Sequence, residues 1–197
     1  SDVFLTGTGN VQFGSTIALG TVAATSDGIR VASDFTFTGT GSITEGSSAL
    51  GLVVPGIVNL NVGAANDIGT ALTPLRTTAG TLNVGLAAAV GGRNVFIDNT
   101  AGFALGTVNT GTASTVALTA GGTITDAAND ALINVIAGSL TLTATAGAVG
   151  ASGTAGQIET DVNTLTAFTP ASGGVFVNEI DTTTVNGQRI TSNGIAK

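Results

Sequence analysis

Residues 140–143 read Leu-Thr-Leu-Thr, and this alternation of an apolar with a polar side chain recurs almost everywhere in the chain. The same pattern occurs in Phe35-Thr36-Phe37-Thr38, Val58-Asn59-Leu60-Asn61-Val62, Leu82-Asn83-Val84 and Val175-Phe176-Val177. A period of two places successive side chains on opposite sides of a strand, and β-branched and aromatic residues favour strands as well. Clusters rich in Gly, Asn and Ser separate these segments. The pattern predicts an all-β protein built from many short strands.

An internal repeat favours a solenoid over a β-sandwich or a barrel. Residues 35–99 align with residues 116–179 at an offset of about 81. We therefore expect a single segment, 1–197, with internal repeats over approximately 35–115 and 116–197 and a partial repeat over 1–34. An offset of about 81 suits roughly four coils of about 20 residues, which predicts roughly nine to ten coils in the whole chain. The expected fold is a right-handed parallel β-helix (β-solenoid), and a β-sandwich is the alternative.

The composition excludes several classes of protein. Only 9% of the residues are charged and 43% are hydrophobic, the reverse of the balance in disordered chains. A net charge of −7 and a few scattered arginines provide no basic stripe for a nucleic acid. No apolar run approaches the ~20 residues of a membrane-spanning helix, so we expect no membrane insertion. The sequence has no Cys, so a continuous hydrophobic core has to hold the fold without disulfides.

Two stretches of the sequence resemble the filamentous haemagglutinin family of large exoproteins and related β-strand-repeat surface adhesins. The first begins at Ser139-Leu140-Thr141-Leu142-Thr143-Ala144-Thr145 and continues to residue 167, and the second is residues 173–179, echoed by 92–99. The resemblance covers about residues 28–190, and it implies the repetitive shaft of such a protein, a right-handed parallel β-helix exported to the bacterial cell surface. The Asn-Pro-Asn motifs of the family's secretion domain and an Arg-Gly-Asp motif are absent from this sequence. The resemblance therefore implies a shaft and an extracellular location, and it implies no receptor site.

Acid–base chemistry would have to rely on carboxylates, because the sequence has no His and no Cys. The candidates for the paired acids of a polysaccharide hydrolase or lyase are Asp126 with Asp130, Glu159 with Asp161, and Glu179 with Asp181. A spacing of two residues puts Glu159 and Asp161 on one face of a strand, about 6–7 Å apart. A sugar cleft normally also offers aromatic platforms, and Trp and Tyr are missing. We therefore expect no enzyme and no catalytic residue, and we interpret these acids as solvated groups that keep the chain soluble.

Two Asn-Asp pairs allow a calcium hypothesis. Asn66-Asp67 and Asn129-Asp130 each follow two alanines and could offer oxygen ligands at the corners of coils. The alternative is that they form turns through ordinary Asx hydrogen bonds. The glycine-rich nonapeptide of calcium-binding β-rolls is not repeated here, and carboxylates are sparse. We therefore expect no metal and no cofactor.

Threonine and phenylalanine residues also have two interpretations. The pairs Thr36/Thr38, Thr141/Thr143 and Thr164/Thr166 resemble the flat threonine array of ice-binding solenoids, but they also fit outward residues of half-buried strands. The phrase is not repeated on every expected coil, which favours the second interpretation. Phe96 and Phe176 align in the repeat, and we predict that both lie in apolar stacks inside the coil.

The sequence thus predicts a non-catalytic structural shaft or adhesin segment of a secreted bacterial cell-surface protein, which holds a binding region away from the cell. The alternatives are a self-assembling extracellular fibre or matrix subunit and a polysaccharide-active β-helix enzyme. The expected partners are neighbouring coils of a longer chain or end-to-end copies of the same chain, and a host or neighbouring-cell receptor or glycan of unknown identity. The first residues, Ser1-Asp2, do not begin a signal peptide, so we expect a mature or excised piece.

Overall fold

The computed structural model describes residues 3–4, 17–19, 29–30, 33–38, 42–45, 51–63, 66–85, 93–169, 173–180, 189–190 and 195–196, and its regular elements are all strands. The amino-terminal strands are β1 (Val3–Phe4), β2 (Ile17–Leu19), β3 (Ile29–Arg30), β4 (Phe35–Thr38), β5 (Ile43–Glu45), β6 (Leu52–Val53) and β7 (Ile57–Asn61). The central strands are β8 (Leu75–Thr77), β9 (Thr81–Val84), β10 (Val95–Asn99), β11 (Phe103–Ala120) and β12 (Ile124–Asp126). The carboxy-terminal strands are β13 (Val135–Ala144), β14 (Ile158–Phe168), β15 (Val177–Glu179), β16 (Arg189–Ile190) and β17 (Ile195–Ala196).

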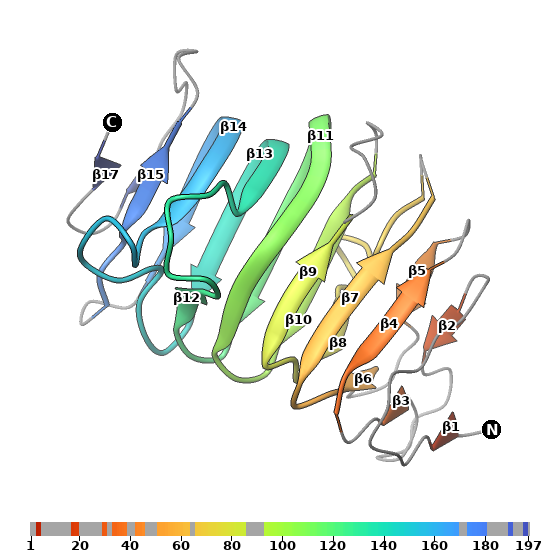
Figure 1. Ribbon diagram of the computed structural model, residues 1–197. Coiled ribbons are helices and arrows are strands. Elements are labelled where there is room, and N and C mark those ends of the chain that lie inside the picture. Colours follow the sequence, from red (N-terminus) through yellow and green to blue (C-terminus); the bar gives the residue numbers. More distant parts are fainter. Residues whose placement is uncertain are drawn as a thin grey trace.

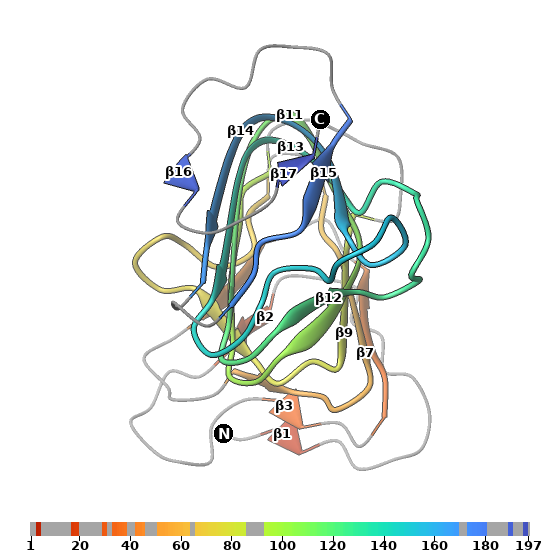
Figure 2. The same ribbon diagram turned by 90° about the vertical axis from the view of Figure 1, so that its left-hand side faces the viewer.

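The strands of the described residues pair in parallel, each with a strand of a neighbouring coil. Fifteen strands belong to one continuous sheet. The coils stand side by side in Figure 1, and Figure 2 looks along the stack, where the strands surround a common interior. Neighbouring strands of such a ladder lie about 4.8 Å apart. The prediction of an all-β parallel solenoid is confirmed.

The coils are longer than the sequence indicated. One inward column runs through Leu52, Thr77, Asn99, Ala120 and Ala144, so residues 51–169 make about five turns. The count of nine to ten coils is therefore not confirmed. Corners and loops lengthen each coil beyond its strands, and the repeat in the sequence does not record their length.

The sequence repeat aligns different sides of the solenoid. From Phe35, three coils lead through Val58 and Leu82 to Leu105. Val116, which the repeat aligns with Phe35, lies beyond Leu105 in β11, in the column of Val95 and Leu140. The repeat thus spans three whole coils and part of a fourth. The similarity relates strands that share the alternation of apolar and polar residues but occupy different sides of the coil.

A single apolar core fills the interior. Alternate residues of each strand point inward, and the column Ile97, Leu118, Leu142 and Ala167 is representative: each of these side chains is buried. Burial of one such leucine contributes about 1.5–3 kcal/mol relative to an exposed one. Apolar side chains stack on apolar side chains of the next coil, so the core is continuous along the solenoid without a disulfide.

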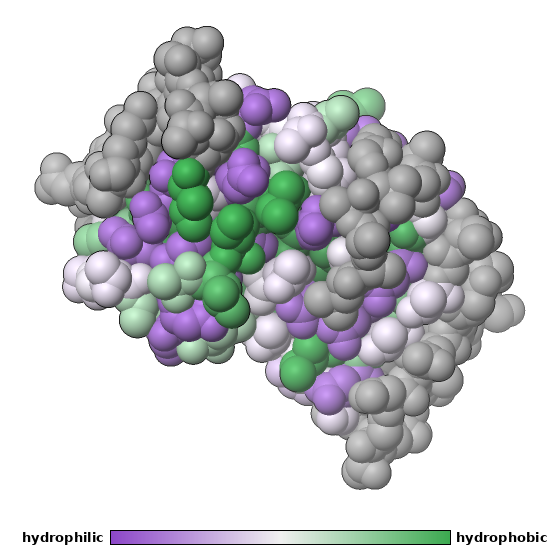
Figure 3. Space-filling model, turned by 45° about the horizontal axis from the view of Figure 1, so that its top comes forward, coloured by the Kyte–Doolittle hydropathy of each residue, from purple (hydrophilic) through white to green (hydrophobic). Residues whose placement is uncertain are grey.

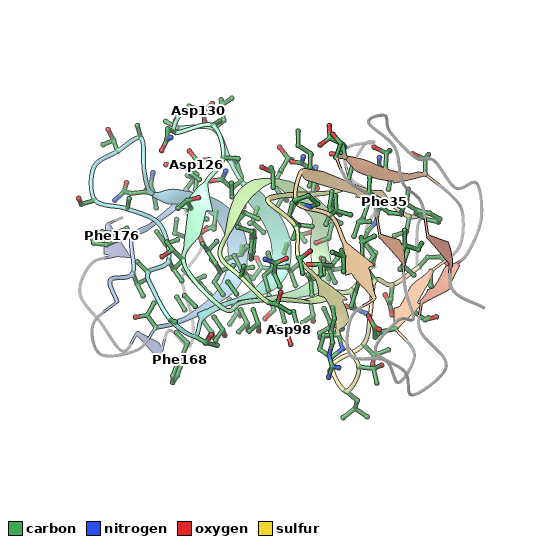
Figure 4. The ribbon with its side chains drawn as sticks, turned by 90° about the horizontal axis from the view of Figure 1, so that it is seen from below. Phe35, Asp98, Asp126, Asp130, Phe168 and Phe176 are labelled. Atoms are coloured by element: carbon green, nitrogen blue, oxygen red, sulfur yellow. The ribbon has the colours of Figure 1, made fainter. Side chains whose placement is uncertain are left out.

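Phe96 and Phe176 do not belong to this core, and the prediction that they do is wrong. Phe96 stands between Val95 and Ile97, which both point inward, so the strand period turns Phe96 outward to a half-buried position beside Ala117. Phe176 is likewise half-buried, with its ring against Gly174, and Figure 4 shows it at the outside of the solenoid. Phe35 and Phe37, by contrast, are buried in the core.

Two loops leave the same side of consecutive coils. Leu105 pairs with Asp126 and Val108 with Val135, so the two residues between Leu105 and Val108 face a longer segment on the next coil. The extra residues form the loop 127–133, and the next coil carries the loop 151–157; Figures 1 and 2 show both loops projecting together from the stack. Parallel pairing resumes after each loop, so the insertions do not disturb the ladder.

Replacing Leu142 by Ala is expected to lower the free energy of unfolding by about 2–5 kcal/mol, because it opens a cavity in a fully buried column. Replacing the adjacent outward Thr141 by Ala should change it by no more than about 0.5 kcal/mol. Urea unfolding followed by circular dichroism measures both variants. An equal loss in the two would contradict the assignment of inward and outward sides.

Candidate functional site

One corner of the solenoid is held by side chains that bond the next coil. Asp67 Oδ1 accepts a hydrogen bond from the Asn94 backbone N–H at 2.7 Å, and Asn94 Oδ1 accepts one from the Thr115 N–H at 3.0 Å. The Asp67 N–H in turn donates to Ser42 Oγ at 3.0 Å. Ser42 Oγ, Asp67 Oδ1 and Asn94 Oδ1 thus all accept hydrogen bonds from backbone N–H groups. The predicted calcium ligands at Asn66-Asp67 are part of this ladder, since Asn66 Oδ1 accepts the Ser42 hydroxyl at 3.4 Å.

A second ladder runs along an outward column. Asn59 Nδ2 donates to Thr36 Oγ1 at 3.2 Å, and Asn83 Nδ2 donates to Asn59 Oδ1 at 2.9 Å. Asn83 Oδ1 then accepts the Thr107 N–H of the following coil at 2.9 Å. Thr36, one of the predicted outward threonines, therefore belongs to a structural amide ladder.

Two polar side chains point into the core and bond the preceding coil in the same way. Asn99 Oδ1 accepts the Thr77 hydroxyl and the Ala79 N–H, both at 2.6 Å. Glu179 repeats this arrangement at the far coils, because its carboxylate accepts the Thr160 hydroxyl at 2.6 Å and the Val162 N–H at 3.0 Å. In each case the side chain accepts the hydroxyl group of the threonine with which it is in register and the backbone N–H of the residue two positions after that threonine. Glu179 is thus a structural acceptor, and its predicted partner Asp181 lies outside the described residues.

The carboxylates that do gather lie at the base of loop 127–133. Asp126 Oδ2 accepts the Asp130 N–H at 2.9 Å, while Oδ1 accepts the Ala128 N–H at 3.1 Å and Asn134 Nδ2 at 2.9 Å. Asp130 Oδ1 accepts the Leu132 N–H at 2.8 Å. Figure 4 shows Asp126 and Asp130 together on one side of the solenoid. The two aspartates are thus neighbours in the structure, and their hydrogen bonds fix the conformation of the loop.

Glu159 completes this group from the next coil. Its N–H donates to Asn134 Oδ1 at 2.9 Å, so Asn134 connects it to Asp126. The Glu159 side chain is 0% exposed, and neither carboxyl oxygen has a hydrogen-bond partner. Burial raises the pKa of the Glu159 carboxyl above its usual range, and the charges of Asp126 and Asp130 raise it further, although the polar backbone N–H of Glu159 itself acts in the opposite direction. The group is chemically unlike every other acid of the described chain.

The predicted placement of Glu159 and Asp161 on one face of a strand is confirmed, but their surroundings differ because Glu159 is buried. The two residues follow on the same side of β14, but Asp161 is half-buried and stands in register with Ile136 rather than with an acid. Sequence reasoning missed Asn134, the residue that links the two coils. A signal for it was present: Asn134 directly precedes the strand that follows the Asn129-Asp130 segment, and Glu159 follows Asn134 by 25 residues, one coil later.

Within the described ranges, no group of three or more acidic, His or Cys side chains is arranged to hold a metal ion. The same ranges contain no helix of the length and apolarity that would cross a membrane. Figure 3 shows apolar side chains gathered in one area of the visible face among hydrophilic ones. The most exposed large apolar side chains are Leu72, at 94%, and Leu132, at 71%, and both lie in surface loops.

The side of the solenoid formed by β10, β11, β13 and β14 carries a grid of hydroxyl groups, the hydroxyl face. Its three columns are Thr115, Ser139 and Thr164; Ala117, Thr141 and Thr166; and Thr119, Thr143 and Phe168. Columns and rows repeat at about 6.7 Å along the strands and about 4.8 Å between coils. Asp98 and Phe168 lie on this side in Figure 4, away from Asp126 and Asp130. Of the predicted Thr-x-Thr pairs, Thr141 is in register with Thr166, whereas Thr143 faces Phe168 and Thr164 faces Ser139.

Comparison with known proteins adds no identification. No protein-family model matches the chain, and no curated protein and no solved structure matches it either.

Replacing Asn99 by Ala is expected to lower the free energy of unfolding by about 1–3 kcal/mol, because the buried Ala79 N–H loses its acceptor. Replacing its outward neighbour Asp98 by Ala should have an effect within about 0.5 kcal/mol. Chemical denaturation of the two variants provides the comparison. Equal midpoints would show that the inward asparagine is dispensable.

Proposed function

We propose that this chain is a non-catalytic shaft segment of a secreted bacterial cell-surface protein, and that it holds a binding region away from the cell. The observation that carries the proposal is the register: strands, corner side chains and inward columns repeat from one coil to the next. Each coil is a template for its neighbour, so such a unit extends along one axis. The bacterial surface location rests on the resemblance of residues 139–145 and 173–179 to haemagglutinin-type exoproteins.

The use of the carboxylates supports a structural function over a polysaccharide-active enzyme. Asp126 and Glu179 are occupied by N–H and hydroxyl donors, and Glu159 is sealed from solvent and so from a polymeric substrate. A paired-acid mechanism needs two carboxyl groups on either side of an accessible sugar bond. We further propose that the solenoid is right-handed, because crossovers between parallel strands take that hand almost without exception.

The shaft proposal predicts that coils can be added. Inserting two further copies of residues 59–82 after Leu82 keeps the register, because Asn59 and Asn83 occupy the same column. The chain should remain folded and lengthen by about 10 Å, twice the strand spacing. Small-angle X-ray scattering measures the maximum dimension.

The matched control inserts the same residues in scrambled order, which keeps composition and length but destroys the alternation. This variant should expose the insert to proteolysis. A register-keeping insert that unfolds or fails to lengthen the particle would contradict the proposal. Release of reducing sugar from a polysaccharide panel by the unmodified chain would contradict its non-catalytic character.

The hydroxyl face favours a second candidate function, binding to ice or to another uncharged, ordered hydroxyl lattice. One of its columns carries a hydroxyl group on three consecutive coils and the other two columns carry one on two coils each, and no hydrogen bond to another side chain of the described residues engages them. An ordered lattice is matched by a rigid, regular grid, whereas a soluble ligand needs a concave site.

Replacing Thr141 and Thr166 by Asp tests this candidate, because two charges in one column break the uncharged grid while both sites remain half-buried strand positions. The unmodified chain is expected to slow ice growth and the double variant to lose that effect, as measured by thermal hysteresis. Thr36→Asp, in the amide ladder on a different column, is the control. No hysteresis in the unmodified chain would remove the candidate.

A further inference from the structure

The Glu159 carboxyl has no counterpart elsewhere in the described chain. It lies in β14 directly after loop 151–157, on the outward side of the strand, yet it is fully buried. Both of its oxygens lack a hydrogen-bond partner. A buried carboxylate with neither a cation nor a hydrogen-bond donor is strongly disfavoured, because nothing replaces the water it has lost.

The groups around Glu159 are acids and amides. Asp126, in β12, and Asp130, in loop 127–133, lie near enough for their charges to act on it. Asn134, before β13, bonds its backbone, and Asn178 is its register partner in β15. On the same strands, Asp161 stands opposite Ile136, and Glu179 points inward to Thr160. The arginines with described side chains, Arg76 and Arg93, belong to earlier coils.

The two nearest acids are suited to different charge states. Asp126 accepts three N–H donors, an environment that favours the charged form of a carboxyl group. Glu159 accepts no hydrogen bond from another described residue and lies beside that charge, so its environment on balance favours the neutral form. A divalent cation would need oxygens that Asp126 already commits to N–H groups, and the carboxylates do not form a metal-binding group. A proton is therefore the occupant that the geometry fits.

We propose that protonated Glu159 is a latch: loop 127–133 is closed over it while the carboxyl is neutral, and ionisation of Glu159 opens the loop. An ionised Glu159 would place another negative charge beside Asp126 and Asp130 without water. Opening loop 127–133 relieves this at small cost, because the loop is fastened by the short-range bonds of Ala128, Asp130 and Leu132, while the flanking strands are held by the ladder. Opening of the loop then brings the buried carboxyl groups of Glu159 and Asp126 into contact with solvent.

The direction of the pH dependence follows from the raised pKa of Glu159. The closed form holds a proton that the open form releases above the ordinary glutamate pKa of about 4.3. Closure is therefore most stable below that pH, and its stability is lost as the pH rises toward the pKa of the closed form. The ratio of open to closed loop should rise by up to about tenfold per pH unit across this window, the limit for one proton.

Hydrogen exchange of the full chain tests the latch, with rates corrected for intrinsic pH dependence. In the unmodified chain, protection of the Ala128, Asp130 and Leu132 amides should fall as the pH is raised above about 5. In Glu159→Gln, a neutral side chain of the same shape, protection should be independent of pH over that range. Amides of β13, such as that of Leu142, report in both proteins that the coil itself remains folded.

Asp161→Asn is the matched control, because it removes an outward carboxylate two residues away and should leave the pH dependence unchanged. Equal pH dependence in the unmodified chain and Glu159→Gln would overturn the latch, and so would pH-independent protection in the unmodified chain. A repeat with calcium chloride or a chelator separates a cation from a proton. Calcium-dependent protection that Glu159→Gln loses would show that the carboxyl binds a cation, and the proposal would be wrong.

Discussion

Parallel backbone pairing from one coil to the next, in register, is the constraint on which the rest of this structure depends. Each strand obtains its hydrogen bonds from the neighbouring coil, so every side chain stands on the counterpart about 4.8 Å away. Inward columns are therefore mostly apolar, which gives one continuous core, and the polar side chains among them are hydrogen-bonded to a neighbouring coil. Outward columns must avoid stacked like charges, which accounts for a chain with only 9% charged residues.

Corners interrupt this pairing, and polar side chains replace it there. Asp67 and Asn94 each accept the N–H of a residue one coil ahead at a corner, and Asn83 does the same from the outward side of β9. Asn99 and Glu179 do the same from inside the core toward the coil behind. A buried N–H without a partner costs about 1–3 kcal/mol, so these acceptors are part of the fold. Asp126 and Glu179, which resemble members of catalytic pairs in the sequence, therefore act as hydrogen-bond acceptors for the backbone.

The alternation of residues was sufficient to predict the strands, because a period of two is a property of each strand alone, whereas the choice of a solenoid rested on the internal repeat. The alternation would also have placed Phe96 on the outward side, since Val95 and Ile97 point inward. The alignment of Phe96 with Phe176 in the repeat led to the wrong prediction that both lie in the core. Coil length was out of reach, because it depends on loops such as 127–133 that carry no periodic signal. The acid group was half predictable: Asp126 and Asp130 are neighbours in sequence, but Glu159 joins them only through the register between coils.

Asp126 and Glu179 accept hydrogen bonds, but the carboxyl group of Glu159 has no donor residue in the described part of the chain. It lies next to a loop that interrupts the pairing between coils. A register-driven solenoid tolerates an insertion only where pairing resumes on both sides, as it does around loop 127–133. Such a loop is free of the axial constraint, so it can open without unravelling the coils. In the proposed latch, closure of loop 127–133 depends on protonation of Glu159, which is buried and has no cation or donor residue beside it among the described residues. Parallel pairing holds the rest of the coil, so its structure does not depend on that proton. The fold thus places the proposed response to pH in a loop that lies outside the coil-to-coil repeat.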